Sequence, residues 1–245
     1  MAVTDHLGAA LDPRGLDRLR ELDDRFRPVT LAERQVLPVL EPLAPLFHGG
    51  GLRRGSVVSV SSSAPGGAAT SFALAAVAAA SGQGSWVAVV GLPTLGLVAT
   101  AELGVALDRL AVVDGVDRGR WPAVVAALVD AVDVVLIGPT RVRPGDARRL
   151  AARARERGAV LLPVGCDWPE APDVALAVDA GRWEGLGAGH GHLQARRVRV
   201  AATGRRDAAR PRATELWLPA PDGGVAAVGH PTVRALRATV CRSAE

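Results

Sequence analysis

The chain contains no lysine, because all 29 of its basic residues are arginine, and it has no tyrosine or asparagine. These absences exclude a lysine Schiff base, a lysine that clamps phosphate, a catalytic tyrosine and an Asn-x-Ser/Thr glycosylation site. The two cysteines, Cys166 and Cys241, are too few for a disulfide scaffold or a structural zinc site. We therefore expect two reduced thiols.

The overall composition is that of a folded protein. The chain has 245 residues, of which 49% are hydrophobic, so it is long enough to bury a core. Its formal charge is +4 and its pI is near 10.6. The sequence begins without the basic segment and apolar run of a signal peptide. The most apolar stretches, 72–80 and 123–137, are too short to cross ~30 Å of hydrocarbon, and we expect a cytoplasmic protein.

Apolar runs alternate with helical patterns through the middle of the chain. This alternation predicts an α/β fold with a mostly parallel central sheet flanked by helices. Two later strands are expected to form an antiparallel pair added to that sheet. The predicted strands are 57–60, 86–90, 110–113, 132–137, 159–164, 174–178, 197–202 and 215–218, and the predicted helices are 70–80, 95–103, 121–130 and 146–157.

Both ends of the chain lie outside this pattern. Residues 1–42 are interpreted as an N-terminal helical arm, because 15–26 has the apolar spacing of an amphipathic helix. The arm would either mediate self-association or dock on its own core. Residues 43–218 form the predicted core, and 219–245 a C-terminal tail. The tail residues Val233, Leu236, Arg237 and Val240 have the spacing of a short partner-binding helix, and a frayed terminus is the alternative.

The segment between the first predicted strand and helix is where a phosphate-binding loop would lie. Such a loop needs G-x-x-x-x-G-K-[ST], in which backbone N–H groups cradle phosphates, the lysine neutralises them and the hydroxyl binds magnesium. The second glycine is present as Gly67, preceded by Gly66. The other required positions hold Ser62 for the first glycine, Ala68 for the lysine and Ala69 for the hydroxyl, with Thr70 displaced by one residue. Without lysine, no alignment restores the motif.

Further segments occur in an informative order. They are 46–55 with its Gly-Gly-Gly-Leu, 94–110, the apolar strand 132–137, and 182–187 followed by 196–200. In order and spacing they resemble the RecA family, and within it the ImuA-type (ImuA′) accessory proteins of bacterial mutagenesis. The resemblance extends over about 43–218. It implies a RecA-like, P-loop-type core with a degenerate phosphate loop.

By this resemblance, the positions needed for ATP hydrolysis hold residues without the required groups. The lysine falls on Ala68, the magnesium hydroxyl on Ala69, the water-activating glutamate on Leu92 and the Walker B aspartate on Gly138. The phosphate-sensing glutamine falls near Gly165. Because phosphoryl transfer depends on positioning and charge neutralisation, the resemblance implies a fold that has lost its ATPase and needs no cofactor or metal.

The resemblance implies a non-catalytic accessory protein in SOS-induced translesion synthesis. Its partner would be an ImuB-like Y-family polymerase homologue and, through it, an error-prone replicative-type polymerase. DNA and a second copy of the chain are further candidate partners, and the protein would join the nucleoid when DNA is damaged. Two alternatives stay open. One is a RecA-like DNA-binding regulator of recombination or repair, and the other is an ATPase that uses Arg53 or Arg54 in place of lysine.

Arginine is concentrated in the second half of the chain. Between residues 141 and 212 there are 15 arginines and 8 acidic residues. Such a surface favours binding to a nucleic-acid backbone, and a solvated arginine surface is an equally weighted alternative. One helix face would carry Arg148, Arg149, Arg153 and Arg157. The candidate DNA-binding or partner-binding residues are Arg182, Trp183, Arg196, Arg197, Arg199, Arg205 and Arg206.

The glycine-rich segment 185–192 contains His190 and His192. A dinucleotide-binding loop would be followed by a helix, whereas an arginine-rich strand is predicted here. Two histidines without further ligands nearby do not make a metal site. We interpret the segment as a loop, and the resemblance to RecA implies that it lies at the position of the second DNA-binding loop, where DNA or a partner would make contact.

Overall fold

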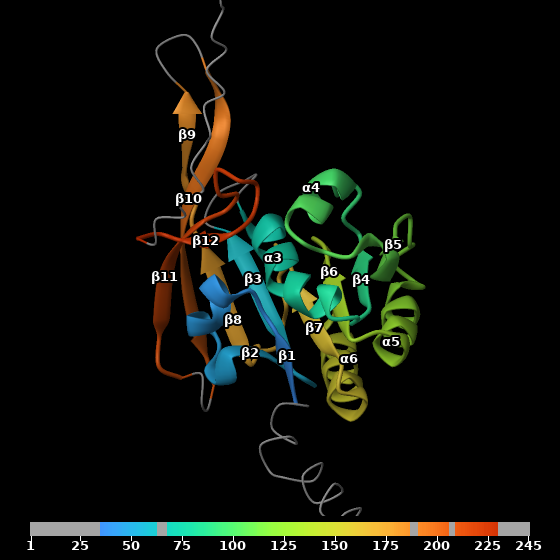
Figure 1. Ribbon diagram of the computed structural model, residues 1–245. Coiled ribbons are helices and arrows are strands. Elements are labelled where there is room, and N and C mark those ends of the chain that lie inside the picture. Colours follow the sequence, from blue (N-terminus) through green and yellow to red (C-terminus); the bar gives the residue numbers. More distant parts are fainter. Residues whose placement is uncertain (1–34, 63–67, 187–190, 206–208, 230–245) are drawn as a thin grey trace, which may run out of the picture.

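The computed structural model describes residues 35–62, 68–186, 191–205 and 209–229 (Figure 1). Several residues singled out above lie outside these ranges, and their predictions stay predictions. They are the helix at 15–26, Gly66, Gly67, His190, Arg206 and the tail residues Val233, Leu236, Arg237 and Val240.

The apolar runs of the core form strands that join into one sheet. The strands are β3 (Val58–Ser62), β4 (Val87–Val90), β5 (Leu110–Val113), β6 (Val134–Ile137), β7 (Val160–Pro163) and β8 (Val174–Val178). Parallel pairing gives the order β5-β4-β6-β7. Parallel bridges from Val57 to Leu161 and from Val60 to Val164 join β7 to β3, which is parallel to β8.

Antiparallel strands extend the sheet beyond β8. They are β9 (Arg182–Leu186), β10 (Gly191–Gly204), β11 (Arg212–Trp217) and β12 (Ala226–Ala227). The long strand β10 pairs with β8, β9 and β11, and β12 pairs with β11. The part of β10 that pairs with β9 projects beyond the sheet as a two-stranded hairpin (Figure 1).

Helices cover both faces of the parallel strands. They are α3 (Ala69–Gly82), α4 (Leu97–Glu102), α5 (Trp121–Ala131) and α6 (Pro144–Arg157). Successive strand residues point to opposite faces. Leu136 accordingly packs in one cluster with Phe72 of α3, whereas Val135 and Ile137 pack in a second cluster with α5 and α6. Strands covered on both faces are apolar at every position, which is why β4, β6 and β7 are continuous apolar runs.

The segment before β3 packs on the α3 side of the sheet. β1 (Val36–Pro38) pairs with β2 (Gly51–Arg53), and the 3-10 helices η1 (Glu41–Leu46) and η2 (His48–Gly50) lie between them. Leu37, Leu43 and Leu52 are buried in the larger of the two core clusters, the one that contains Phe72 and Leu136. The described end of the predicted arm therefore belongs to the core.

The α/β prediction is confirmed, with parallel strands flanked by helices and a late antiparallel pair at β10 and β11. Residues 185–192, expected to form a loop, instead include the end of β9 and the start of β10. All five residues of β9 are exposed, so the strand lacks the alternation of buried and exposed residues by which a strand is usually recognised.

The first part of the predicted tail also packs on the sheet, because β12 pairs with β11 and Ala220 is buried.

Among the described residues, no helix has the length and apolar character needed to cross a membrane.

Candidate functional site

The phosphate-loop prediction concerns the edge of the sheet where the parallel strands end. The described residues that flank the loop are Ser62, which closes β3, and Ala68, which precedes α3. Ala68 is fully buried and Ala69 is 7% exposed, and both belong to the larger core cluster. Thr70 is half-buried in the first turn of α3. The positions expected to hold a lysine and a metal-binding hydroxyl are therefore occupied by small apolar side chains packed in the core.

Leu92 and Gly138 meet at this same edge. Each follows the end of a strand, β4 or β6, and the backbone N–H of Gly138 donates to the carbonyl oxygen of Val90 at 2.8 Å. A Cβ atom on Gly138 would lie 2.0 Å from the carbonyl oxygen of Gly91 and 2.9 Å from Cγ of Leu92. No side chain fits at Gly138 without a shift of the backbone. The two residues thus form an apolar contact where the resemblance would place two carboxylates.

Gly165 also lies at this edge. It follows β7, has a positive φ of 59°, and donates its backbone N–H to the carbonyl oxygen of Val60 at 2.8 Å. The fold thus brings to one edge the five residues that the resemblance singled out: Ala68, Ala69, Leu92, Gly138 and Gly165. None of the five carries a charged or hydroxyl group.

The opposite edge of the sheet holds Arg53 and Arg54, which precede β3. The Arg54 guanidinium donates to the Asp133 carboxylate at 2.7 Å, and the same carboxylate accepts the backbone N–H of Trp86 at 2.9 Å. β3 is five residues long, so ~16 Å of strand separates these arginines from the phosphate-loop edge. Neither arginine is placed to substitute for the missing lysine.

Arg196 of β10 is a structural residue. It is 8% exposed, its guanidinium donates to the carbonyl oxygen of Ala180 at 3.1 Å, and it lies over the ring of Trp183 at 5.4 Å from the ring centroid. Burial lowers the pKa of its guanidinium, while the nearby Asp179 acts in the other direction. These contacts fix the base of the hairpin and leave Arg196 and part of Trp183 unavailable to DNA or a partner.

The other candidate arginines on the late strands differ in whether their side chains already form a hydrogen bond or an ion pair within the protein. Arg197 forms an ion pair with Glu215 across the β10–β11 ladder, and this contact lowers the pKa of the Glu215 carboxyl. Arg205 donates to the carbonyl oxygen of Ala171. Within the described residues, the side chains of Arg182 and Arg199 have no hydrogen bond or ion pair. The fold therefore does not bring the six described candidates together as one open basic surface, and Arg206 lies outside the described residues.

The arginine face predicted for the helix 146–157 is neutralised within the protein. Arg153 and Arg157 both contact Asp130 of α5, and these contacts lower the pKa of the Asp130 carboxyl to about 2. Arg148 and Arg149 contact Glu170 and Asp146. Arg148, Arg153 and Arg157 thus attach α6 to its surroundings, whereas the Arg149 pair lies within α6. The count of basic residues therefore overstates the charge available to a nucleic acid.

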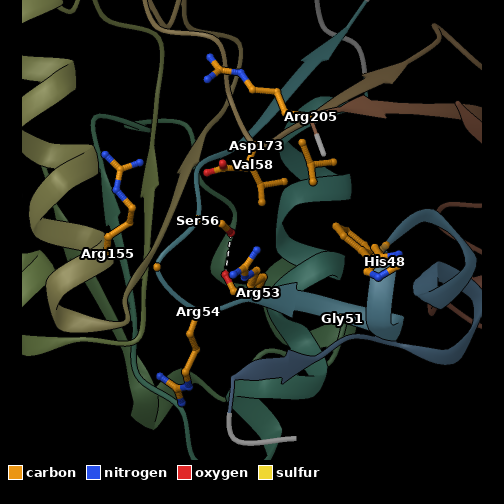
Figure 2. Close-up of a pocket in the computed structure, with 12 residues that line it drawn as sticks. His48, Gly51, Arg53, Arg54, Ser56, Val58, Arg155, Asp173 and Arg205 are labelled. Atoms are coloured by element: carbon orange, nitrogen blue, oxygen red, sulfur yellow. Dashed lines mark hydrogen bonds between the residues drawn. The ribbon is translucent and has the colours of Figure 1, made fainter. Parts of the chain in front are cut away.

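Two cavities lined by arginine were not found by sequence reasoning. One, of about 440 Å³, lies at the edge that holds Arg53 and Arg54 (Figure 2). The other, of about 700 Å³, lies between the starts of α5 and α6 and includes Arg118, Arg141 and Arg143. The residues of each cavity come from separate segments, so no local motif marks them.

The comparisons with known proteins place the chain in a family. The chain belongs to the family of the MT3502 N-terminal domain, whose model matches residues 45–170. That range includes the strands β3 to β7 and the phosphate-loop edge.

The chain is also similar to a protein of Mycobacterium tuberculosis (strain ATCC 25618 / H37Rv) named "Uncharacterized protein Rv3395c". The two are 43% identical over 103 residues, which is 41% of this chain. The aligned part spans 50% of the length of the mycobacterial protein.

Proposed function

We propose that this protein is a RecA-like accessory protein that has no ATPase activity and acts by binding partners. The observation that carries the proposal is the contact between Gly138 and Leu92, which leaves no space for a metal-binding carboxylate. The buried Ala68 and the absence of lysine remove the phosphate clamp as well. A site without these groups has nothing to neutralise the charge that develops in phosphoryl transfer.

The order of the strands supports the RecA-like part of the proposal. β3 and β4 are consecutive in the chain, yet β7 and β6 lie between them in the sheet. The connection after β3 therefore leaves the sheet at a change of strand order, which is where open α/β sheets bind ligands. This strand order supports the proposal that the loop lies where a related fold would bind a nucleotide, and the residues described there carry none of the groups needed for hydrolysis.

The sequence resemblance to ImuA-type proteins supplies the proposed partners. They are an ImuB-like Y-family polymerase homologue and, through it, an error-prone replicative-type polymerase, in SOS-induced translesion synthesis. When a fold loses its catalytic groups but keeps its packing, the remaining function depends on its surfaces. The hairpin of β9 and β10 is one such surface, because it projects from the sheet with Leu186 and Leu193 exposed.

The test combines nucleotide binding with partner capture. The purified full chain is expected to show no magnesium-dependent ATP hydrolysis above background, with a RecA ATPase as the positive control. It is expected to co-purify with an ImuB-like protein from the same source. Magnesium-dependent hydrolysis that Arg53→Ala or Arg54→Ala abolishes would overturn the proposal in favour of the atypical ATPase.

The tail contributes a separate test of partner capture. Removing 230–245 leaves β12 and its pairing with β11 in place, so the core is expected to keep its stability. If 230–245 binds the partner, as the spacing of Val233, Leu236 and Val240 predicts, the shortened chain loses co-purification. Unchanged co-purification would show that another surface makes the contact.

The DNA-binding regulator remains the second candidate, favoured by Arg182 and Arg199, whose side chains are exposed and without an ion pair in the described part of the chain. Binding of the isolated protein to single-stranded DNA would weaken steeply as salt increases. It would also weaken in Arg182→Gln with Arg199→Gln. A protein that binds DNA in this way but captures no polymerase partner would favour the regulator over the adaptor.

A further inference from the structure

The cavity of about 440 Å³ lies at the edge opposite the phosphate-loop position. Val58 and Val174, the first residues of β3 and β8, lie in its wall. Its other residues come from the segment of η2, β2 and the β2–β3 turn, from α6, from Asp173 before β8 and from Arg205 after β10. The volume is within the ~300–1,000 Å³ of small-ligand sites. This cavity is separate from the degenerate phosphate loop, so its chemistry must be judged from its own residues.

Positive charge dominates the lining. Four arginines and one carboxylate contribute, together with the imidazole of His48. The carboxylate, Asp173, accepts the backbone N–H of Val57 at 2.9 Å. Arg54 is paired with Asp133, and in Figure 2 its side chain extends away from the other labelled residues. The lining therefore holds more cations than its own acidic group can balance.

Arg53 and Arg155 are the arginines available to a ligand. Both are exposed, and within the described residues neither side chain has a hydrogen bond or ion pair. Both line the cavity, and they come from different elements, the end of β2 and the last turns of α6 (Figure 2). Arg205 lies on a third side and contacts the Ala171 carbonyl through one of its nitrogens. A guanidinium presents a planar fork of donors that matches phosphate oxygens in two-point contacts.

The wall that carries Arg53 is fixed before any ligand binds. Gly55 has a positive φ of 74°, and its backbone N–H donates to the carbonyl oxygen of Ala159 at 3.1 Å. A Cβ on Gly55 would lie 3.0 Å from Cα of Arg155, so glycine allows the turn to approach α6 closely. The hydroxyl of Ser56 donates to the carbonyl oxygen of Arg53 at 2.6 Å. A rigid wall reduces the entropic cost of binding.

We propose that this cavity binds a phosphate-bearing small molecule with at least two negative charges, held between Arg53 and Arg155. The lining holds four arginines and one carboxylate, so its positive charge favours an anion. Arg53 and Arg155 lie on different elements, and this favours a ligand with more than one phosphate. Phosphates of a nucleic-acid backbone share this chemistry. The cavity volume of about 440 Å³ favours a compact ligand over an extended strand.

The test measures binding of inorganic pyrophosphate and triphosphate to the full chain by calorimetry at low and at physiological salt. The wild type is expected to bind with an affinity that falls about tenfold in Arg53→Gln and again in Arg155→Gln, because each loses a charge-assisted contact. Arg149→Gln is the matched control, since Arg149 lies on the same helix but pairs with Asp146 outside this cavity. It is expected to bind as the wild type does.

Three outcomes would overturn the proposal. In the first, neither phosphate compound binds the wild type at low salt. In the second, Arg149→Gln loses as much affinity as the cavity variants, which would indicate binding to net charge alone. In the third, single-stranded DNA binds and is lost in the cavity variants, while the small phosphates do not bind. Because Arg53 and Arg155 are exposed, the variants are expected to keep the wild-type melting temperature. None of these outcomes depends on whether the protein captures a polymerase.

Discussion

A side chain placed at Gly138 provides the most direct test of the structure. We expect Gly138→Ala to be strongly destabilising and Gly138→Asp more so. The strands β4 and β6 are adjacent and parallel, with Val90 opposite Ile137, so the residues that follow them are held close together. A Cβ at this position would stand 2.0 Å from the Gly91 oxygen and 2.7 Å from the Gly91 carbonyl carbon. These are backbone atoms of a fixed strand end, which cannot rotate away as a flexible side chain could.

The magnitude follows from the cost of adding volume to a packed interior. Inserted methylene groups typically cost ~1–3 kcal/mol, and a clash with backbone places Gly138→Ala at the upper part of that range. Aspartate adds a charge beside a carbonyl oxygen and the 7%-exposed Leu92, where a carboxylate would lack a partner. An aspartate at Gly138, the position that the RecA resemblance assigns to the Walker B residue, is therefore expected to unfold this edge of the sheet before it supplies any metal ligand.

The assay is chemical denaturation of the full chain followed by circular dichroism, with the free energy of unfolding compared between variants. Gly145→Ala is the control, because Gly145 is in the first turn of α6 and the nearest atom to an added Cβ is 4.0 Å away. Alanine there is expected to leave stability unchanged or raise it by up to ~1 kcal/mol. A Gly138→Ala protein as stable as the wild type would refute the packing described for β4 and β6.

Three further predictions concern other residues. The pKa of Asp130 is held at about 2, chiefly by the Arg153 hydrogen bond, so the stabilising contact is complete above about pH 4 and is lost as the pH falls toward 2. Asp130→Asn should remove that part of the acid dependence from a pH series of denaturation curves, and an unchanged acid dependence would contradict the pairing. Burial, with a smaller effect of Asp167, raises the pKa of the Cys166 thiol to about 11. In a Cys241→Ser chain, iodoacetamide should therefore modify Cys166 at least ~10-fold more slowly at pH 8 than free cysteine, and equal rates would count against the burial. Arg196→Ala should cost ~1–3 kcal/mol of stability, because it removes the Ala180 hydrogen bond and the stacking on Trp183, whereas Arg199→Ala should stay within ~0.5 kcal/mol. Equal effects of these two substitutions would refute the structural role of Arg196.

Strand and helix positions in the core could be predicted from the sequence because burial on both faces has a local signature. The apolar run at 132–137 predicts β6 without knowledge of its neighbours, and the same is true of β4 and β7. β9 has no such signature, since its residues are held by pairing with β10 and not by burial. The N-terminal pair of β1 and β2 was missed because each strand has only three residues.

The roles of the arginines could not be predicted from the sequence, because an ion pair depends on residues that are distant in the chain. Arg153 and Asp130 are 23 positions apart, and Arg54 and Asp133 are 79 apart. A count of basic residues treats Arg196, which is buried, like Arg199, which is exposed. Leu92 and Gly138 were singled out only through the resemblance to RecA, because neither residue carries a group whose chemistry marks a site. The structure shows that they lie in contact, and the roles that the resemblance gives them stay predictions.

Asp133 links several strands at the amino edge of the sheet. Its carboxylate accepts from the Arg54 guanidinium and from the Trp86 backbone, and its carbonyl oxygen accepts the N–H of Val160 at 2.8 Å. One residue thereby joins the turn before β3 to the starts of β4 and β7. Local opening at any of these points must break bonds that the others share. The amino ends of these strands should consequently exchange their amide hydrogens as one cooperative unit.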